Sequence, residues 1–572
     1  MSELPIRPYE RLAASFHPWD PRTLEVARGV AALVASAWPG AIVEHVGSSS
    51  VPGLPGKNII DLGVEIEPDD IPGFTQALYS LGFGPQPGVA AFPATRPMVV
   101  GAVQQGDDLL RIHLHVMPPG RRELPEMMAF RDALRSDTAL REGYAAAKQA
   151  IVDSTAAGTD PGVYTLRKSN YVLDALYRLE IRKRPADAPE PLAPGATIGI
   201  LGGGQLGRML GFAARAMGYR IVVLDPDPLC PAAGIADELI VAPYDDAEAA
   251  VRLAERSDVV TYELEHVGEA AAAAAAAVKP LRPAMGVLRA TRDRLVERRF
   301  LRSIGELTAP WREVRGVAET EAAADELGYP LRLKQPVGGY DGRSQARIAS
   351  RSGVAAAVAA LGATDGRPML LEREIDFEME LSVVVARDRR GRTLAFPVSQ
   401  NVHDQGILVE SIAPAPVDIL VANEASEVAG SIARRLDLVG VLTVELFRPR
   451  GGGTMVNELA PRVHNSGHWT VDGAATSQFE QHLRAILGLP LGSVTAHGVA
   501  AMVNLLGSGP DRPARLAGVE LALADPDVHV HVYDKRRVFE RRKMGHVTVV
   551  ATDADDALAR ARAARALLRW ED

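Results

Sequence analysis

Short apolar runs separated by glycine-rich turns open the second half of the chain. The run TIGIL (197–201) predicts a buried strand, and the glycine-rich segment GGGQLG comes directly after it. The next segment, RMLGFAARAMGY (208–219), has the apolar spacing of a helix, and RIVVLDPD (220–227) again has the pattern of a strand. This order predicts a β-α-β unit of a parallel sheet.

Strand patterns dominate most of the chain beyond residue 280. Residues 281–365 alternate helix and strand patterns, and LRLKQPVGGYDGRSQARI (331–348) predicts two strands joined by a glycine-rich loop. ELSVVVARD (380–388) and GVLTVELFRP (440–449) predict further strands, and HVTVVA (546–551) predicts one near the end of the chain. The second half is therefore expected to hold several strand-rich α/β domains.

The first half has its own pattern and ends at a clear seam. Residues 41–66 predict a strand, a loop and a second strand, LLRIHLHVMP (109–118) predicts another strand, and the pattern is helical from residue 126 onward. The segment Arg182–Ala196 is rich in proline and has no apolar periodicity, which predicts a stiff linker between domains.

Composition narrows the class of protein. The 572 residues exceed what one core accommodates, and 47% hydrophobic with 24% charged residues is typical of globular domains. The net charge of −9 argues against a nucleic-acid-binding protein. The single cysteine, Cys230, excludes a disulfide framework and a cysteine-ligated zinc site. No signal peptide or membrane span is expected, so a cytoplasmic location is predicted.

The glycine loop after the first strand allows two interpretations. Gly202, Gly204 and Gly207 form G-x-G-x-x-G, and Asp225 lies at a distance close to that of the ribose-binding acid of a dinucleotide site. Taken alone, this pattern suggests an NAD-dependent oxidoreductase. The same turn, however, serves any strand-to-helix junction whose amide groups point at an anion.

Lysine, glycine and carboxylate positions downstream indicate phosphate and metal chemistry. Lys334 ends a predicted strand just before the glycine-rich loop 338–344, whose amides can close over a triphosphate. Glu445 and Glu458 lie on neighbouring predicted strands, beside Asn457. Two carboxylates placed in this way can hold Mg²⁺ while the nucleotide supplies its other ligands.

A series of motifs gives the second half a family resemblance. Six motifs occur in this order: GILGGGQLGRML, DVVTYELE, LKQPVGGYDGRSQ, NVHDQGILVESIAPAP, NELAPRVHNSGHWT and RKMGHV. Residues 196–570 thereby resemble carboxyaminoimidazole ribonucleotide synthases of the ATP-grasp superfamily. The resemblance implies that ATP, bicarbonate and aminoimidazole ribonucleotide form the N-carboxylated nucleotide, ADP and phosphate in purine biosynthesis. It implies that bicarbonate attacks the γ-phosphorus to give carboxyphosphate, and that the enzyme is a homodimer.

The resemblance also implies a set of site residues. Positions that match the ATP-binding set of the family are Arg294, Lys334, Gly338, Gly339, Tyr340, Asp341, Gly342, Arg343, Ser344, Glu372, Arg373, Glu374, Ile375, Glu380, His403, Asn457 and Glu458. Glu445 and Glu458 match the magnesium pair. The positions that match catalytic or substrate-binding groups are Arg462, His464, Lys535, Arg542, Asp341, Gln205 and Glu263. In this family the dinucleotide-like opening helps to hold the nucleotide substrate and does not bind NAD.

Five positions depart from the family pattern. Ser344 and Arg541 stand where glycine is usual, Arg298 where lysine is usual, His266 where asparagine is common, and Arg332 at a position that is normally apolar. None removes a group of the implied ligand set. They leave open a third interpretation, a degenerate scaffold that binds nucleotide without turnover.

Four motifs occur in order in the first half: EHVGSSSVPGLPGKNIIDLGVEI, RIHLHVM, FRDALR and YAAAK. Through these motifs, residues 8–180 resemble the GrpB family, which is related to nucleotidyltransferases. Gly47, Ser48 and Lys57 match the phosphate-binding turn, and Asp61 matches one metal-binding acid. The second acid of the usual D-x-D pair is absent, because Gly63 stands in its place.

Three other side chains bear on this first domain. Glu65 shares the strand face of Asp61 but lies about 13 Å further along the strand, too far to share one ion. His113 and His115 share one strand face and could ligate a metal together with Asp61. A structural or solvent-facing histidine pair is the alternative.

These observations predict an α/β and α+β multidomain chain. The expected parts are a nucleotidyltransferase-like domain (1–181), the linker (182–196), a Rossmann-like domain (197–295), an ATP-grasp domain (296–495) and a small C-terminal domain (496–572). The predicted activity is that of an ATP-grasp ligase using ATP and Mg²⁺. The rivals are an NAD oxidoreductase and the degenerate scaffold.

Overall fold

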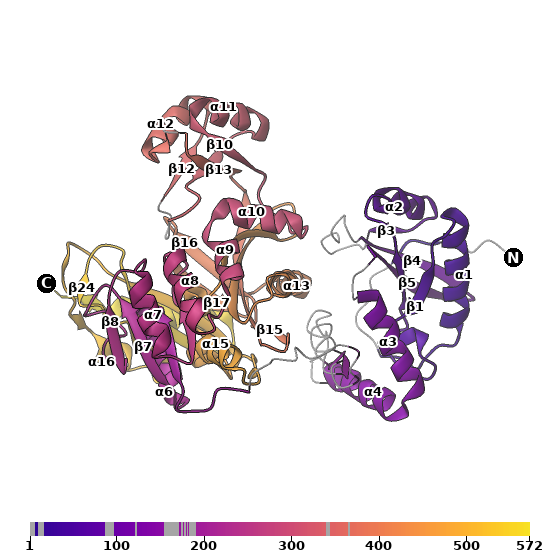
Figure 1. Cartoon of the computed structure of the whole chain (residues 1–572), viewed down its shortest axis with the longest axis horizontal. Helices are drawn as coiled ribbons and strands as arrows, with labels where there is room; N and C mark the ends of the chain where they lie inside the picture. Colours follow the sequence, from indigo (N-terminus) through magenta and orange to yellow (C-terminus); the bar gives the residue numbers. More distant parts are fainter. Residues whose placement is uncertain are drawn as a thin grey trace. The chain divides into compact units, whose positions relative to one another are not determined.

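The computed structural model describes residues 6–9, 16–85, 97–119, 123–153, 171–172, 175–176, 179, 181, 190–338, 344–363 and 366–571. The chain forms two compact units (Figure 1). Unit 1 comprises Met1–Asp187 with Ile419–Glu424, and unit 2 comprises Ala188–Asp418 with Ala425–Asp572. In the described part of the chain, no helix is both long and apolar enough to cross a membrane.

Unit 1 is built on a five-stranded sheet with the order β1-β2-β5-β4-β3. The strands are β1 (Val43–Val46), β2 (Ile60–Glu65), β3 (Gly84–Pro85), β4 (Met98–Gln105) and β5 (Asp108–Met117), and the helices are α1 (Arg22–Ala37), α2 (Ile71–Ser80), α3 (Glu123–Ser136) and α4 (Thr138–Asp153). Alternate residues of β2 and β5, such as Leu62 and Leu114, join apolar residues of α1 and α2 in one core. Because side chains alternate along a strand, Asp61, His113 and His115 lie on the opposite face of the sheet.

Unit 2 begins with the parallel sheet that the sequence predicts. Its strand order is β8-β7-β6-β9, and every pairing is parallel. The strands are β6 (Thr197–Leu201), β7 (Arg220–Asp225), β8 (Glu238–Val241) and β9 (Val259–Tyr262), and the helices are α6 (Gln205–Ala216), α7 (Ala247–Glu255), α8 (Glu269–Val278) and α9 (Met285–Arg292). Two apolar clusters, one containing Leu253 and one containing Leu210, bury its two faces. Gln205 and Glu263, just past the carboxyl ends of β6 and β9, border a large cavity of the unit.

A small lobe follows, made of the antiparallel sheet β10-β13-β11-β12 and two helices (Figure 1). Its elements are β10 (Trp311–Arg315), α11 (Gly316–Leu327), β11 (Leu331–Lys334), β12 (Gln345–Ile348), α12 (Val354–Ala360) and β13 (Pro368–Arg373), and α10 (Arg294–Ser303) leads into it. Leu331 and Leu333 point into the core under α11 and α12. Alternation therefore places Arg332 and Lys334 on the other face of β11.

The rest of unit 2 is organised by a nine-stranded sheet in the order β19-β18-β14-β16-β17-β20-β25-β23, with β15 paired to β14. Its strands are β14 (Phe377–Arg387), β15 (Thr393–Ala395), β16 (Ser399–Asp404), β17 (Ile407–Ala413), β18 (Gly440–Pro449), β19 (Met455–Ala460), β20 (Val499–Leu506), β23 (Val528–Val532) and β25 (Lys543–Ala551). Helices α13 (Ile419–Arg435), α14 (Thr470–Gly473), α15 (Gln478–Leu487), α16 (Val519–Ala522) and α17 (Ala554–Leu567) accompany it, with short strands β21 (Arg512–Pro513), β22 (Leu516–Ala517), β24 (Arg537–Val538) and β26 (Arg569–Trp570). Since β17 pairs with β20, the sheet runs on across the predicted division at residue 496.

Candidate active site

A cavity of about 1280 Å³ lies in unit 2, where the parallel sheet, the small lobe and the large sheet meet. Its wall includes most of the residues implied by the resemblance: Gln205, Glu263, Arg294, Lys334, Glu372, Arg373, Glu374, Ile375, Glu380, His403, Glu445, Asn457, Glu458, Arg462, His464, Lys535 and Arg542. Gly338 and Ser344 are outside the lining. Gly339, Tyr340, Asp341, Gly342 and Arg343 lie outside the described residues.

Two carboxylates face each other across neighbouring strands of the large sheet. Glu445 on β18 is directly opposite Glu458 on β19, and a register shift occurs at Leu446. Burial and the neighbouring charge of Glu458 raise the pKa of Glu445 to about 7. Like charges placed opposite each other destabilise a sheet unless a cation lies between them. The pair therefore fits Mg²⁺, which prefers a few carboxylate oxygens and takes its other ligands from phosphate and water.

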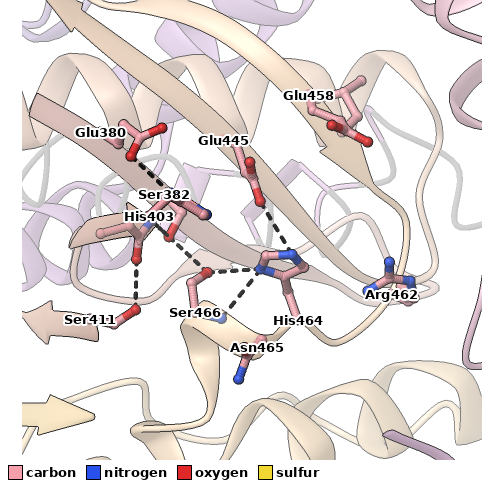
Figure 2. A network of polar contacts seen from close by, with 12 residues as sticks. Glu380, Ser382, His403, Ser411, Glu445, Glu458, Arg462, His464, Asn465 and Ser466 are labelled. Carbon is pink, nitrogen blue, oxygen red and sulfur yellow. Dashed lines mark hydrogen bonds and ion pairs between the residues drawn. The ribbon is translucent and has the colours of Figure 1, made fainter. Parts of the chain in front are cut away.

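His464 is held beside this pair by contacts at both ring nitrogens (Figure 2). The backbone N–H of Ser466 donates to Nδ1 at 3.3 Å, and the Ser466 hydroxyl lies 3.0 Å from the same nitrogen. Because Nδ1 accepts, the ring hydrogen is on Nε2, which lies 3.2 Å from the Glu445 carboxylate. Burial, and then the positive charge of Arg462, place the pKa of His464 well below its usual value. The imidazole is thus neutral and carries its hydrogen on Nε2.

A relay of buried polar side chains fixes that orientation (Figure 2). The Asn401 amide donates to the Ser382 hydroxyl at 2.9 Å, and Ser382 donates to Ser466 at 2.8 Å. Ser411 donates to the amide oxygen of Asn401 at 2.7 Å. Because the Ser466 oxygen already accepts from Ser382, its own hydrogen is available for His464. The hydrogen bonds of Asn401, Ser382 and Ser466 therefore run in one direction toward the imidazole.

A second histidine contacts a carboxylate on the next strands. His403 on β16 places Nδ1 2.8 Å from Glu380 on β14. Burial opposes the charged form of His403, but the hydrogen bond to Glu380 and the field of Glu445 outweigh it and raise its pKa. When His403 is protonated, it forms an ion pair with Glu380 beside the acidic pair.

The lysine that ends β11 is fixed by a buried ion network. Lys334 Nζ lies 2.7 Å from Glu372, and the same carboxylate lies 2.5 Å from Arg298 Nε. Arg298 also contacts Glu297 at 2.7 Å and donates to the Asn457 carbonyl at 2.6 Å. Burial opposes ionisation of Glu372, but Arg298 and Lys334 outweigh it and lower its pKa to about 2. Arg298 uses its three nitrogens on three partners, which a lysine at this position cannot reproduce in the same planar geometry.

Arg462 is paired with a glutamate that the sequence did not single out. Its Nε and Nη2 lie 2.6 and 3.0 Å from the two oxygens of Glu265, and Nη1 donates to the Val463 carbonyl. Bidentate pairs of this kind orient the guanidinium plane strongly. Sequence reasoning nominated Glu263 and passed over Glu265, two residues further on. An anion bound at Arg462 would share this guanidinium with Glu265.

The glycine loop binds the chain's own carboxylates, which contradicts the NAD interpretation. Glu263 accepts hydrogen bonds from the amides of Gly204 and Gly207, both at 2.6 Å. Asp225 accepts from the amide of Gly203 at 2.8 Å and from the Tyr244 hydroxyl at 2.6 Å, and it is only 3% exposed. The amides that would hold a pyrophosphate are therefore occupied, and the predicted ribose-binding acid is buried. Glu263 lines the cavity, but its two oxygens hold the loop.

Cations from the C-terminal region complete the wall. Lys535 donates to the Gln205 side chain at 2.8 Å and to the Lys543 carbonyl at 2.6 Å. Arg542 donates to the Arg537 carbonyl at 2.7 Å and stacks on Phe539. Because Lys535 bonds to Gln205 at the start of α6, these cations lie at the end of the cavity formed by the parallel sheet.

The structure shows the surroundings of the positions that depart from the family pattern. Ser344 and Arg541 both adopt left-handed backbone conformations, with φ of 62° and 66°, which explains why glycine suits these positions. Arg332 pairs with Glu374 at 2.9 Å on the cavity face of β11. His266 also lines the cavity, and neither of its ring nitrogens has a hydrogen-bond partner among the described residues.

The known protein families that match this chain divide it in the same way as the two compact units do. A model of the ATP-grasp domain matches residues 299–479, one of the ribonucleotide synthetase preATP-grasp domain matches 195–292, and one of the phosphoribosylaminoimidazole carboxylase C-terminal domain matches 500–560. A model of the GrpB protein matches 14–178. The last match covers most of unit 1, and the first three together cover nearly all of unit 2.

Individual relatives agree with the family models for unit 2. N5-carboxyaminoimidazole ribonucleotide synthase of Brucella melitensis is 44% identical over 357 residues, which are 62% of this chain and 97% of that protein. The protein of the same name from Bacillus subtilis is 40% identical over 367 residues, 64% of this chain and 93% of that protein.

Solved structures show the same likeness. The N5-carboxyaminoimidazole ribonucleotide synthetase of Thermotoga maritima is 36% identical with a TM-score of 0.59, covering 66% of this chain and 99% of that one. The Aspergillus clavatus N5-carboxyaminoimidazole synthase, in complex with ADP and 5-aminoimidazole ribonucleotide, is 33% identical with a TM-score of 0.60, covering 65% and 98%.

Proposed function

Because the chain belongs to the family of N5-carboxyaminoimidazole ribonucleotide synthases, we propose that the cavity of unit 2 is its active site. The reaction joins bicarbonate to the amine of 5-aminoimidazole ribonucleotide, at the expense of ATP, and releases ADP and phosphate. It belongs to purine biosynthesis. The observation that carries the assignment of the site is the convergence of the Glu445–Glu458 pair with Lys334 and Arg462 in one cavity.

The acidic pair fits Mg²⁺, as its opposed charges and the raised pKa of Glu445 indicate. Magnesium, when bound, neutralises charge on the phosphate oxygens. Glu445 and Glu458 would hold the ion, and Asn457 lies beside them. Phosphoryl transfer demands mainly positioning and charge stabilisation from the protein, and the cavity offers both.

In this proposal, residues on the side of the cavity formed by the small lobe position ATP. Lys334 is a point charge fixed by Glu372, and that carboxylate is in turn fixed by Arg298. The nucleotide therefore meets a preorganised cation, which does not have to be ordered on binding. Glu380 and His403 line the same cavity, in contact with each other.

The opposite side supplies groups for bicarbonate and the ribonucleotide. Arg462 offers a guanidinium for an oxyanion, and Lys535 and Arg542 offer charges for a ribose phosphate. His464 acts as a hydrogen-bond donor, because its Nδ1 is occupied by Ser466 and its Nε2 carries the hydrogen. This geometry favours donation of a hydrogen bond by His464 to an oxyanion over removal of the proton from the amine.

ADP formation by the full chain tests the proposal. We expect Mg²⁺-dependent ADP release that requires both bicarbonate and 5-aminoimidazole ribonucleotide, with the carboxylated nucleotide detected by mass spectrometry. ADP release that is independent of the ribonucleotide, or none at all, would contradict the proposal, and the second outcome would favour a degenerate scaffold. The homodimer stays a prediction, which analytical ultracentrifugation checks.

A further inference from the structure

Three metal-binding side chains converge on one face of the unit 1 sheet. Strands β2 and β5 are parallel neighbours, and Asp61 is in register with His113 and Gly63 with His115. The same carboxylate oxygen, Asp61 Oδ1, lies 3.6 Å from His113 Nδ1 and 3.8 Å from His115 Nε2. Gly63 has no side chain, and Leu124 fills the space that a Cβ atom there would occupy.

These separations suit a metal ion better than hydrogen bonds. Both exceed the range of 2.7–3.2 Å that is usual for a hydrogen bond. Ligand atoms around a tetrahedral ion with bonds of about 2.0–2.1 Å are about 3.3–3.4 Å apart, so small side-chain shifts would close the site. The two imidazole planes are inclined at 78°, which allows both in-plane lone pairs to point at one centre.

The surroundings orient the ligands as in a metal site. The other nitrogen of His113, Nε2, lies 2.9 Å from the Tyr9 hydroxyl. Such a partner fixes the orientation of the ring in metal-binding histidines. The second oxygen of Asp61 packs against the backbone of Gly47, where a Cβ atom would approach it to 2.4 Å, and Gly47 has a φ of 71°. Only glycine fits at that position, so the carboxylate is held with Oδ1 toward the histidines.

A second group of side chains in the described part of the chain is less suited to binding a metal ion. Asp472, His531 and His546 in unit 2 also bring their polar atoms together. There, His531 Nε2 already makes a 2.9 Å hydrogen bond to Asp472. The rings of His531 and His546 are stacked, with only 18° between their planes, so their lone pairs cannot converge on one ion.

We propose that Asp61, His113 and His115 bind a divalent transition-metal ion of the zinc type. One carboxylate and two imidazoles select such an ion over Mg²⁺, which prefers oxygen ligands. The three side chains are 16–26% exposed, so an ion can enter from solvent. Three protein ligands leave at least one coordination position for water or a substrate oxygen. Catalytic zinc sites keep such an open position, whereas structural zinc sites do not.

Cobalt titration of the tag-free, metal-stripped full chain tests this site. Excess Mg²⁺ and ADP are present throughout, so that the oxygen ligands of unit 2 are occupied. We expect one equivalent of Co²⁺ to bind with the strong visible absorption of a nitrogen-ligated ion of low coordination number, and Zn²⁺ to displace it. Weak absorption typical of a fully hydrated ion would overturn the proposal.

Matched variants locate the binding. Asp61→Asn and His115→Gln should each weaken Co²⁺ binding by at least about tenfold. His531→Gln, in the stacked cluster, should leave it unchanged. Far-UV circular dichroism and thermal midpoints matching the parent show that the variants are folded. Equal affinity of parent and folded His115→Gln, or loss of binding in His531→Gln, would refute the assignment.

Discussion

Each unit places an acidic side chain opposite a polar side chain of the neighbouring strand, but the partners of those acids differ. In unit 2, Glu445 and Glu458 oppose each other on antiparallel strands, beside a cavity of about 1280 Å³ lined with cations. In unit 1, Asp61 lies on β2 and faces two imidazoles of the parallel neighbour β5. The first arrangement suits a hard ion that shares its ligands with a triphosphate, and the second suits an ion held largely by nitrogen.

The difference lies in what completes each site. The acidic pair of unit 2 offers only oxygen ligands, and its two carboxylates repel each other when no cation is bound. Binding of a metal ion there therefore depends on the nucleotide. The unit 1 group includes neutral ligands and an orienting hydroxyl, so its ion needs no substrate to be bound. Substitutions and metal titrations at the two sites test this contrast.

Glu458→Gln should have the largest effect. The variant keeps the shape of the side chain but removes half of the charge that holds Mg²⁺, so we expect kcat to fall by about 10³-fold. Steady-state ADP formation at saturating substrates measures this. Glu378→Gln, an acid outside the cavity lining, is the matched control and should retain activity. A Glu458→Gln enzyme with near-parental turnover would show that the acidic pair does not hold the ion.

Tyr9→Phe should weaken metal binding in unit 1 by about tenfold. The change removes the hydroxyl beside His113 Nε2 without altering the ligands, so the imidazole loses its fixed orientation. Co²⁺ affinity of the full chain, with Mg²⁺ and ADP present, measures the effect. An unchanged affinity would mean that the ring is oriented by other contacts.

The Mg²⁺ affinity of unit 2 should depend on pH in a defined direction. The folded pKa of Glu445, about 7, lies above the ordinary value of 4.5, so the folded chain without metal binds an extra proton between these values. This group therefore lowers stability as pH rises from 4.5 to 7, and Mg²⁺ must displace its proton below pH 7.

We accordingly expect Mg²⁺ to bind about tenfold more weakly at pH 6 than at pH 8. Calorimetry with ADP present, in two buffers of different ionisation enthalpy, also reports the proton released. In Glu458→Gln the remaining pH dependence should shift to lower pH, because the neighbouring charge is gone. Binding independent of pH in the parent would contradict the charge coupling of the pair.

Ser466→Ala should have the smallest effect. It removes one neutral hydrogen bond from His464 Nδ1 while the backbone N–H remains, so a loss of about two- to tenfold in kcat is expected. Because the Mg²⁺ ligands are untouched, the Mg²⁺ affinity should not change. A large loss of Mg²⁺ affinity would show that the relay supports the metal pair directly.

The sequence could predict residues that carry a local pattern. Lys334 ends a strand before a glycine-rich loop, Glu445 and Glu458 lie on neighbouring strands, and the structure brings them to one cavity. The parallel opening of unit 2 was likewise predicted correctly from apolar runs and turns. Local pattern and family motif agree at these positions.

Contacts between distant segments could not be predicted in this way. Glu265 and Arg462 are 197 positions apart, and nothing in TYELE distinguishes Glu265 from Glu263 as the partner. The glycine loop suggested NAD because its amides seemed available, but Glu263, 56 to 59 positions away, occupies two of them. Ser382 and Asn401 look like ordinary strand residues until tertiary packing aligns them behind His464.

The most direct test of whether ATP and bicarbonate react in this cavity is the transfer of ¹⁸O from bicarbonate to phosphate. The full chain is incubated briefly with ¹⁸O-labelled bicarbonate, ATP and 5-aminoimidazole ribonucleotide, before the label exchanges with water. The account predicts that the released phosphate carries one ¹⁸O from bicarbonate. Phosphate that contains oxygen only from ATP and water, despite ribonucleotide-dependent ADP formation, would contradict it.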